Sequence, residues 1–179
     1  MPKIAVVYVR VVDRFNYFIG RIMMYGIFFL IGVLMYSVFA KQAFTIPPFW
    51  TLEVAQFTLV AYYLLGGAYS IQLGANVRMD LFYSTWSPRR KAWFDSFTVI
   101  LLIFYLAVML FGGVESMLYS IKYQQHSASM WRPLIWPVKA IMVSGILMML
   151  LQAVSELIKD IAVLRGVDMR KDMRGKGIA

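Results

Sequence analysis

The sequence contains no cysteine and a single histidine among its 179 residues. Without cysteine there is no disulfide, no thiol chemistry and no Cys-ligated metal, and the redox compartment is not indicated. A four-helix thiol–quinone reductase is therefore excluded. A four-helix haem protein needs paired axial histidines, which one histidine does not supply. We expect His126 to be an exposed loop residue rather than a ligand.

Charge is also scarce. Charged residues make up 15% of the chain and hydrophobic residues 61%, whereas about one quarter of a soluble domain is charged. Burial in a bilayer explains this composition. Four stretches lack any acidic or basic side chain: 22–40, 54–77, 96–114 and 140–155.

The second stretch would form a helix of ~36 Å, enough to cross a hydrocarbon core of ~30 Å. The fourth extends outward through Pro133–Val138, with Lys139 as the one interruption. The stem of Lys139 can lie along the helix while its ammonium reaches the headgroups. We expect an all-α membrane protein with four transmembrane helices, at about 22–40, 54–77, 96–114 and 135–157.

The absence of charge inside these spans also excludes functions. Ionisable groups deep in a membrane mark ion paths, proton relays and substrate sites. A small multidrug exporter would need a carboxylate in its first span, and 22–40 has none. The sequence shows no phosphate loop, metal cluster or nucleophile–base pair. We expect no catalysis, no metal and no cofactor in this chain, and a self-sufficient transporter is disfavoured.

The positive charge is unevenly placed. The net charge of +9 would suggest nucleic acid in a soluble protein, but here membrane topology explains it better. Fourteen of the 18 Lys and Arg residues lie before the first span, between the second and third spans, or after the fourth. The positive-inside rule places both termini and the middle loop in the cytoplasm. The basic residues before the first span, with Val38–Ala40 as a weak cleavage site, resemble a signal peptide. Because the apolar stretch and the arm before it are longer than in a typical signal peptide, we expect the first span to be retained as a transmembrane helix.

An arm at 1–21 precedes the four-span domain at 22–158. In this arm Val7, Val11, Phe15 and Phe18 recur at helical spacing. This pattern predicts a short amphipathic helix at the cytoplasmic membrane surface. The alternative is a basic extension of the first span. At the other end we expect 159–179 to be an unpacked, basic cytoplasmic tail.

The loop between the second and third spans predicts another interfacial helix, because apolar residues at 79, 82, 83 and 86 have helical spacing. Ser87 and Pro88 then provide an N-cap and a proline at the first helical position. Arg89, Arg90 and Lys91 follow, and we expect them to contact anionic phospholipid headgroups as well as to fix topology.

Two further features concern anchoring and packing. Trp50, Trp131 and Trp136 flank the outer loops and are typical interfacial anchors, with an external docking surface as the alternative. In the second span, Gly66, Ser70 and Gly74 recur at every fourth residue, and the third and fourth spans offer Gly112, Gly113 and Gly145. Such small residues allow helices to approach closely in lipid. They serve packing within the chain or contact with another membrane protein.

Several motifs in fixed order carry a family resemblance: Trp50–Glu53, Leu65–Tyr69, Asn76–Asp80, Ser87–Arg90 and Pro133–Lys139. With this order and spacing, the chain resembles the small, Q-type (DctQ-like) membrane subunit of tripartite ATP-independent periplasmic (TRAP) transporters over roughly 15–159. Two positions depart from the family pattern. Many members have histidine in place of Asn76 and arginine in place of Gln56, so no titrating or charged role transfers there.

The resemblance implies a non-catalytic scaffold, or stator, for a large elevator-type membrane subunit. A periplasmic protein would capture an organic acid, and a sodium gradient would drive its import across the bacterial inner membrane. Trp50 and Glu53 are then candidates for a polar contact at the outer face. Arg78 and Asp80 are candidates for a local pair or a bond to the large subunit, although as a solvated i, i+2 pair they would not face each other on a helix. The alternative is a free-standing membrane sensor or assembly factor whose arm and tail bind a cytoplasmic partner.

Overall fold

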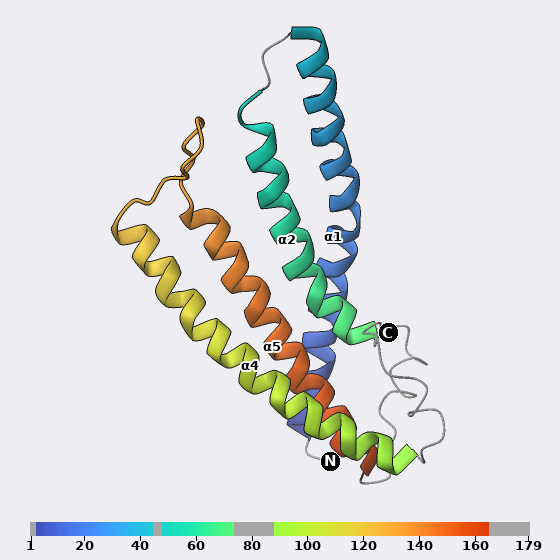
Figure 1. Cartoon of the computed structure of the whole chain (residues 1–179). Helices are drawn as coiled ribbons and strands as arrows, with labels where there is room; N and C mark the ends of the chain where they lie inside the picture. Colours follow the sequence, from blue (N-terminus) through green and yellow to red (C-terminus); the bar gives the residue numbers. More distant parts are fainter. Residues whose placement is uncertain (1–2, 45–47, 74–87, 165–179) are drawn as a thin grey trace.

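The computed structural model describes residues 3–44, 48–73 and 88–164. These segments form four helices, α1 (Lys3–Phe44), α2 (Thr51–Leu73), α4 (Pro88–Lys122) and α5 (Trp136–Leu164) (Figure 1). All four are long and apolar enough to cross a membrane. The four predicted spans are confirmed as helices, and three of them extend well beyond the uncharged stretches.

The helix ends follow from local sequence. α4 begins at Pro88, as predicted, because proline lacks the N–H that a first helical residue leaves unpaired. At the start of α2, the Thr51 hydroxyl donates to the Pro48 carbonyl at 2.9 Å, and the Val54 amide donates to the Trp50 carbonyl at 3.0 Å. After α4 the chain turns through Gln124, whose φ is 45°.

α5 holds the bundle together. It packs along α4 on one side and α2 on the other, and it also contacts α1, which runs beside α2 (Figure 1). The apolar core centres on Leu106 of α4 with Ile146 and Ala153 of α5. The α2–α5 contact is close because Gly145 lies against Leu64, so that a Cβ at Gly145 would meet Leu64 Cβ at 2.8 Å.

The arm at 1–21 is not a separate helix. From Lys3 onward it is helical and continuous with the first span in α1. The four residues of the predicted apolar face, Val7, Val11, Phe15 and Phe18, are all exposed, and the buried side consists of Val9, Val12, Asp13, Asn16 and Gly20. The side that faces the protein is therefore mixed, with two valines beside Asp13 and Asn16, and the exposed side carries the four apolar residues together with Arg10 and Arg14.

The predicted tail needs a correction. The structure continues α5 to Leu164, and Lys159 and Asp160 are 4% and 3% exposed. The expectation that the chain is unpacked from Lys159 onward is wrong for this turn, because Lys159 is bound by side chains of the arm and of α5. The helix predicted between the second and third spans lies outside the described residues.

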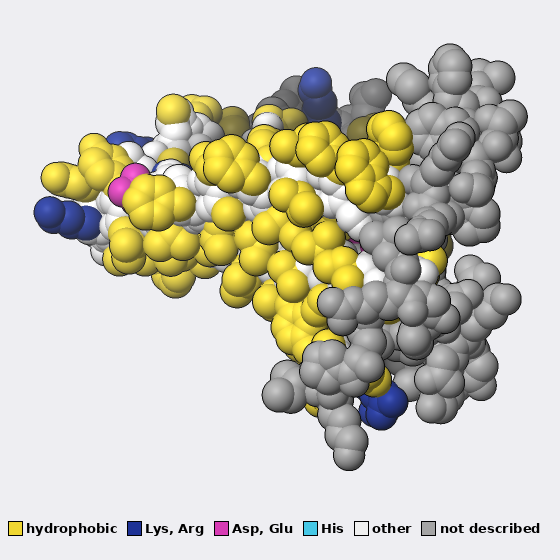
Figure 2. All heavy atoms as spheres, turned by 90° about the horizontal axis from the view of Figure 1, so that it is seen from below, with side chains coloured by type: hydrophobic (Ala, Val, Ile, Leu, Met, Phe, Trp, Pro, Cys, Tyr) yellow, Lys and Arg dark blue, Asp and Glu magenta, His cyan; other side chains and the backbone are white. Residues whose placement is uncertain are grey.

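The described surface is largely apolar. Figure 2 shows hydrophobic side chains covering most of the described face seen from below, with basic side chains near its edges. Along α1 and α4, large residues such as Phe28, Phe39, Phe104 and Phe111 are at least 64% exposed. Apolar side chains that face outward together with buried polar ones are what a bilayer or another membrane protein requires.

Candidate subunit interface

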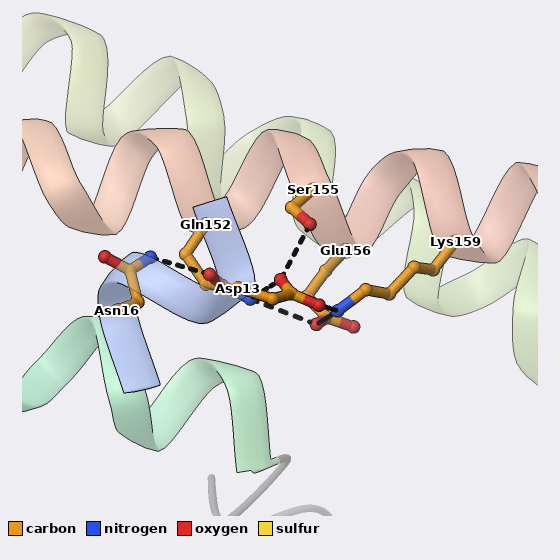
Figure 3. A network of polar contacts seen from close by, with 6 residues as sticks. All are labelled: Asp13, Asn16, Gln152, Ser155, Glu156 and Lys159. Atoms are coloured by element: carbon orange, nitrogen blue, oxygen red, sulfur yellow. Dashed lines mark hydrogen bonds and ion pairs between the residues drawn. The ribbon is translucent and has the colours of Figure 1, made fainter. Parts of the chain in front are cut away.

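A buried polar network joins α1 to α5 at the end of the bundle opposite the short loops (Figure 3). Its centre is Asp13, whose Oδ2 lies 2.7 Å from Nζ of Lys159. The other oxygen of Asp13 accepts bonds from the Ser155 hydroxyl and the Gln152 amide, each at 3.0 Å. This carboxylate is thus bound by one cation and two neutral donors, which offsets its loss of water.

The network continues on both sides of Asp13. Asn16 donates through Nδ2 to Oε1 of Gln152 at 2.7 Å. Lys159 also contacts Glu156 at 2.7 Å. All six residues in Figure 3 are buried, and together they contain two carboxylates and one ammonium. The network fixes the arm against α5.

A second polar cluster lies at the loop end, between α4 and the start of α5. The Lys139 ammonium donates to the Ser120 hydroxyl at 2.5 Å and to the Ser116 carbonyl at 3.3 Å. Ser120 in turn donates to Oε1 of Gln125 at 2.7 Å. Lys139 thus binds the last turns of α4, where a positive charge also suits the helix dipole. The ammonium of Lys139 was expected to extend to the lipid headgroups; in the structure it binds α4 instead.

The loop between α4 and α5 folds into a small hairpin. His126 and Leu134 form an antiparallel bridge, supported by bonds from the Ser127 amide to the Pro133 carbonyl and from the Ile135 amide to the Gln125 carbonyl. The Ser127 hydroxyl donates to Oε1 of Glu53 at 2.7 Å, which ties the hairpin to the first turn of α2.

Glu53 is 4% exposed, and its second oxygen has no hydrogen-bond partner among the described residues. A carboxylate in the first turn of a helix is stabilised by the free N–H groups and the dipole there. Glu53 therefore makes its hydrogen bond within the chain, to Ser127 of the hairpin.

Trp50 lies next to this turn and remains 39% exposed. Its ring packs on Tyr36 of α1 with centroids 5.7 Å apart. Between the same two segments, the hydroxyls of Ser37 and Thr51 are hydrogen bonded at 2.9 Å. These contacts hold α1 to the start of α2 while one side of the Trp50 indole stays open.

Two members of the predicted row of small residues, Gly66 and Ser70, lie among the described residues. A Cβ built at Gly66 meets no heavy atom within 4 Å, and Ser70 is half-buried. The packing glycines of α2 and α5 are instead Gly67, against Met149, and Gly145. Gly66 and Ser70, both half-buried, align at helical spacing with five exposed residues of α2, and the seven together form its outward row: Leu52, Gln56, Leu59, Tyr63, Gly66, Ser70 and Leu73.

The remaining predicted residues are only partly placed. Gly74, Arg78 and Asp80 lie outside the described residues, and Arg89, Arg90 and Lys91 lie in the first turn of α4. No group of His, Cys, Asp or Glu able to hold a metal occurs in 3–44, 48–73 or 88–164.

The comparison with known families decides the class of protein. The family model for tripartite ATP-independent periplasmic transporters, DctQ component, matches residues 30–163. The chain belongs to the DctQ family. It is therefore the small membrane component of a TRAP transporter, an integral membrane protein and not a member of a family known for catalysis. Comparison with curated proteins and with solved structures gave no match.

DctQ components act with a large membrane subunit and a periplasmic binding protein in tripartite systems. In this DctQ chain the network around Asp13 and Lys159 was missed by reasoning from sequence, although one signal was available. Gln152, Ser155, Glu156 and Lys159 follow the i, i+3, i+4, i+7 pattern of one helix face. A polar stripe there, after a charge-free span, indicates a polar partner on another helix.

Proposed function

We propose that this chain is the fixed, non-catalytic scaffold of a TRAP transporter that imports an organic acid with a sodium gradient. The bacterial inner membrane is the proposed location, with both termini cytoplasmic. The large membrane subunit would be a stable partner, and the periplasmic binding protein a transient one. The support for orientation is the excess of Lys and Arg before the first span, between α2 and α4, and after the fourth span.

One observation carries the scaffold proposal: Asp13, Lys139, Glu156 and Lys159 lie outside the uncharged stretches and are bound within the chain. Asp13, Glu156 and Lys159 join α1 to α5, and Lys139 joins α5 to α4. The intervening stretches 22–40, 54–73, 96–114 and 140–155 carry no acidic or basic side chain. An anionic substrate would find no cationic partner there, so its site belongs to another subunit.

The outward row of α2 is the proposed contact for the large subunit. Gly66 and Ser70 are small, and a Cβ at Gly66 would meet no atom of the other described helices within 4 Å. In lipid, where hydrophobic surface alone does not drive association, small residues permit close helix contact, and polar residues such as Gln56 add hydrogen bonds. Trp50 at the outer end, with Gly74, Arg78 and Asp80 at the inner end, would extend this contact. Arg89, Arg90 and Lys91 are proposed to bind headgroups.

Copurification tests the scaffold proposal. The chain is coexpressed with the large membrane subunit and the complex is isolated in mild detergent or lipid nanodiscs. A stoichiometric complex is the predicted result. Recovery of the chain alone, while the large subunit remains folded, would contradict it. The same complex, supplied with the binding protein, allows carboxylate uptake to be measured in a sodium gradient and in a potassium gradient.

A further inference from the structure

The arm of α1 has an outer face that consists of Val7, Val11, Phe15 and Phe18. These side chains are 57%, 61%, 53% and 64% exposed. The opposite side of the same turns is buried against α5 through Asp13 and Asn16. If this face were in water, the carboxylate and amide would be expected to be exposed and these four apolar side chains buried, because water solvates carboxylates and amides and not valine or phenylalanine.

The bilayer core does not account for the whole of this outer face. Arg21 is exposed, lies 5.7 Å from the centroid of the Tyr17 ring, and marks the end of the uncharged stretch. At a rise of ~1.5 Å per residue, Val11 lies ~15 Å and Val7 ~21 Å beyond Arg21 along α1. The interfacial layer of a bilayer is only ~5–8 Å thick on each side. Because α1 is one helix held to α5 by the network, the arm does not fold down onto the membrane.

Two exposed arginines, Arg10 and Arg14, lie one turn apart beside the outer face. A purely apolar cover would leave both guanidinium groups at its edge without partners, whereas acidic side chains would pair with them. Immersion in acyl chains is also unfavourable for two arginines. The surface thus fits a protein segment with an apolar face and acidic margins.

We infer that the outer face of the arm is the docking surface for an amphipathic, acidic segment of the large membrane subunit. This inference rests on the proposed function and adds a contact outside the hydrocarbon core. The network of Asp13 and Lys159 has a role in it, since it holds the arm against α5 and leaves its outer face available to the partner. Arg10 and Arg14 set the register through charge pairing.

The absence of native cysteine allows a direct test. Single variants Val11→Cys and Phe15→Cys are reconstituted in liposomes, alone and with the large subunit, and reacted with a hydrophilic maleimide. Ala128→Cys, at an exposed position of the hairpin, is the control. The arm variants are predicted to react readily in the chain alone and at least tenfold more slowly in the complex, while the control changes less than twofold.

The other outcomes separate the alternatives. Slow reaction of the arm variants both alone and in the complex, with quenching by lipid-borne nitroxide, would overturn the inference in favour of a lipid cover. Equal, rapid reaction in both samples would overturn it in favour of water. Failure of the complex to form would refute the proposed function and the inference together. The double variant Arg10→Glu/Arg14→Glu should lower the yield of complex at least fivefold, and an unchanged yield would contradict the charge pairing.

Discussion

Asp13 of α1 and Lys159 of α5 form a buried ion pair with Oδ2 and Nζ 2.7 Å apart, although they lie near opposite ends of the sequence. Their side chains are 4% and 5% exposed, and Asp13 also accepts from the hydroxyl of Ser155. The pair connects the first helix to the last and makes the arm a rigid continuation of the first span. The position of the arm against α5 depends on this contact.

Loss of Lys159 is predicted to destabilise the chain more than loss of Asp13. Lys159→Met removes the cation that binds the buried carboxylate of Asp13 and also contacts Glu156, and it should cost ~3–5 kcal/mol. Asp13→Asn keeps an acceptor for Ser155 and leaves Lys159 paired with Glu156, so its cost should be smaller. Unfolding in mixed micelles at increasing SDS fraction measures both. Arg14→Gln, at an exposed position, should stay within ~0.5 kcal/mol. The reverse order of Lys159→Met and Asp13→Asn would contradict this description of the network.

Two glycines offer a matched comparison of packing. Gly145→Ala would place a Cβ 2.8 Å from Leu64 Cβ and 3.0 Å from its carbonyl carbon, so α2 and α5 must separate. A loss of ~1–3 kcal/mol is expected for such overpacking. Gly66→Ala meets nothing within 4 Å and should change stability by less than ~1 kcal/mol, since alanine favours a helix over glycine. The same unfolding assay applies, and equal losses for the two variants would contradict the assigned α2–α5 contact.

The four spans, the helical start at Pro88 and the family were predictable from the sequence. Long charge-free stretches and a proline after serine are local signals, and a bilayer imposes helices on such stretches. The packing of the arm was not predictable in the same way. Its periodicity identified Val7, Val11, Phe15 and Phe18 as one face, but only the contact with α5 shows that this face points outward.

Lys139 and Gly66 also show that a sequence pattern does not define which neighbouring helix a side chain contacts. A lysine at the end of a span suits either headgroups or a neighbouring helix end, and the presence of Ser120 and Gln125 nearby decides between them. The repeat of small residues at 66, 70 and 74 did not reveal that Gly67, one position later, is the residue that packs on Met149. Rotation of a helix about its axis depends on its neighbours in space, which periodicity alone does not define.

Ser127 is predicted to control the position of the hairpin. Ser127→Ala removes the hydrogen bond to Glu53 and leaves both oxygens of a buried carboxylate without a described partner. A cost of ~1–3 kcal/mol is expected. Hydrogen exchange of 123–135 should accelerate at the same time, because the hairpin loses its tie to α2.

Glu53→Gln is the control for this pair. The glutamine carbonyl still accepts from the Ser127 hydroxyl and carries no charge, so the variant should lose less stability than Ser127→Ala. If Glu53→Gln accelerated hydrogen exchange in 123–135 as much as Ser127→Ala, the negative charge rather than the hydrogen bond would hold the hairpin.

Gly66→Leu is predicted to impair assembly with the large subunit without changing the stability of the isolated chain. A Cβ at this position meets no atom of the other described helices within 4 Å, so the isolated chain is expected to retain its unfolding midpoint. A leucine on the outward row of α2 would prevent close approach of a partner helix, and the recovered complex with the large subunit should fall at least fivefold. Leu59→Met, on the same row and similar in volume, is the control and should retain the complex. Normal recovery with Gly66→Leu would place the partner elsewhere.

Transport in proteoliposomes tests the scaffold function most directly. Uptake of a labelled carboxylate is measured with the binding protein outside and an inward sodium gradient, in vesicles that contain this chain, the large subunit, or both. The predicted result is sodium-dependent uptake with both subunits and none with this chain alone, and a large loss of uptake when this chain is omitted. Uptake by this chain alone, or full uptake by the large subunit without it, would contradict the account.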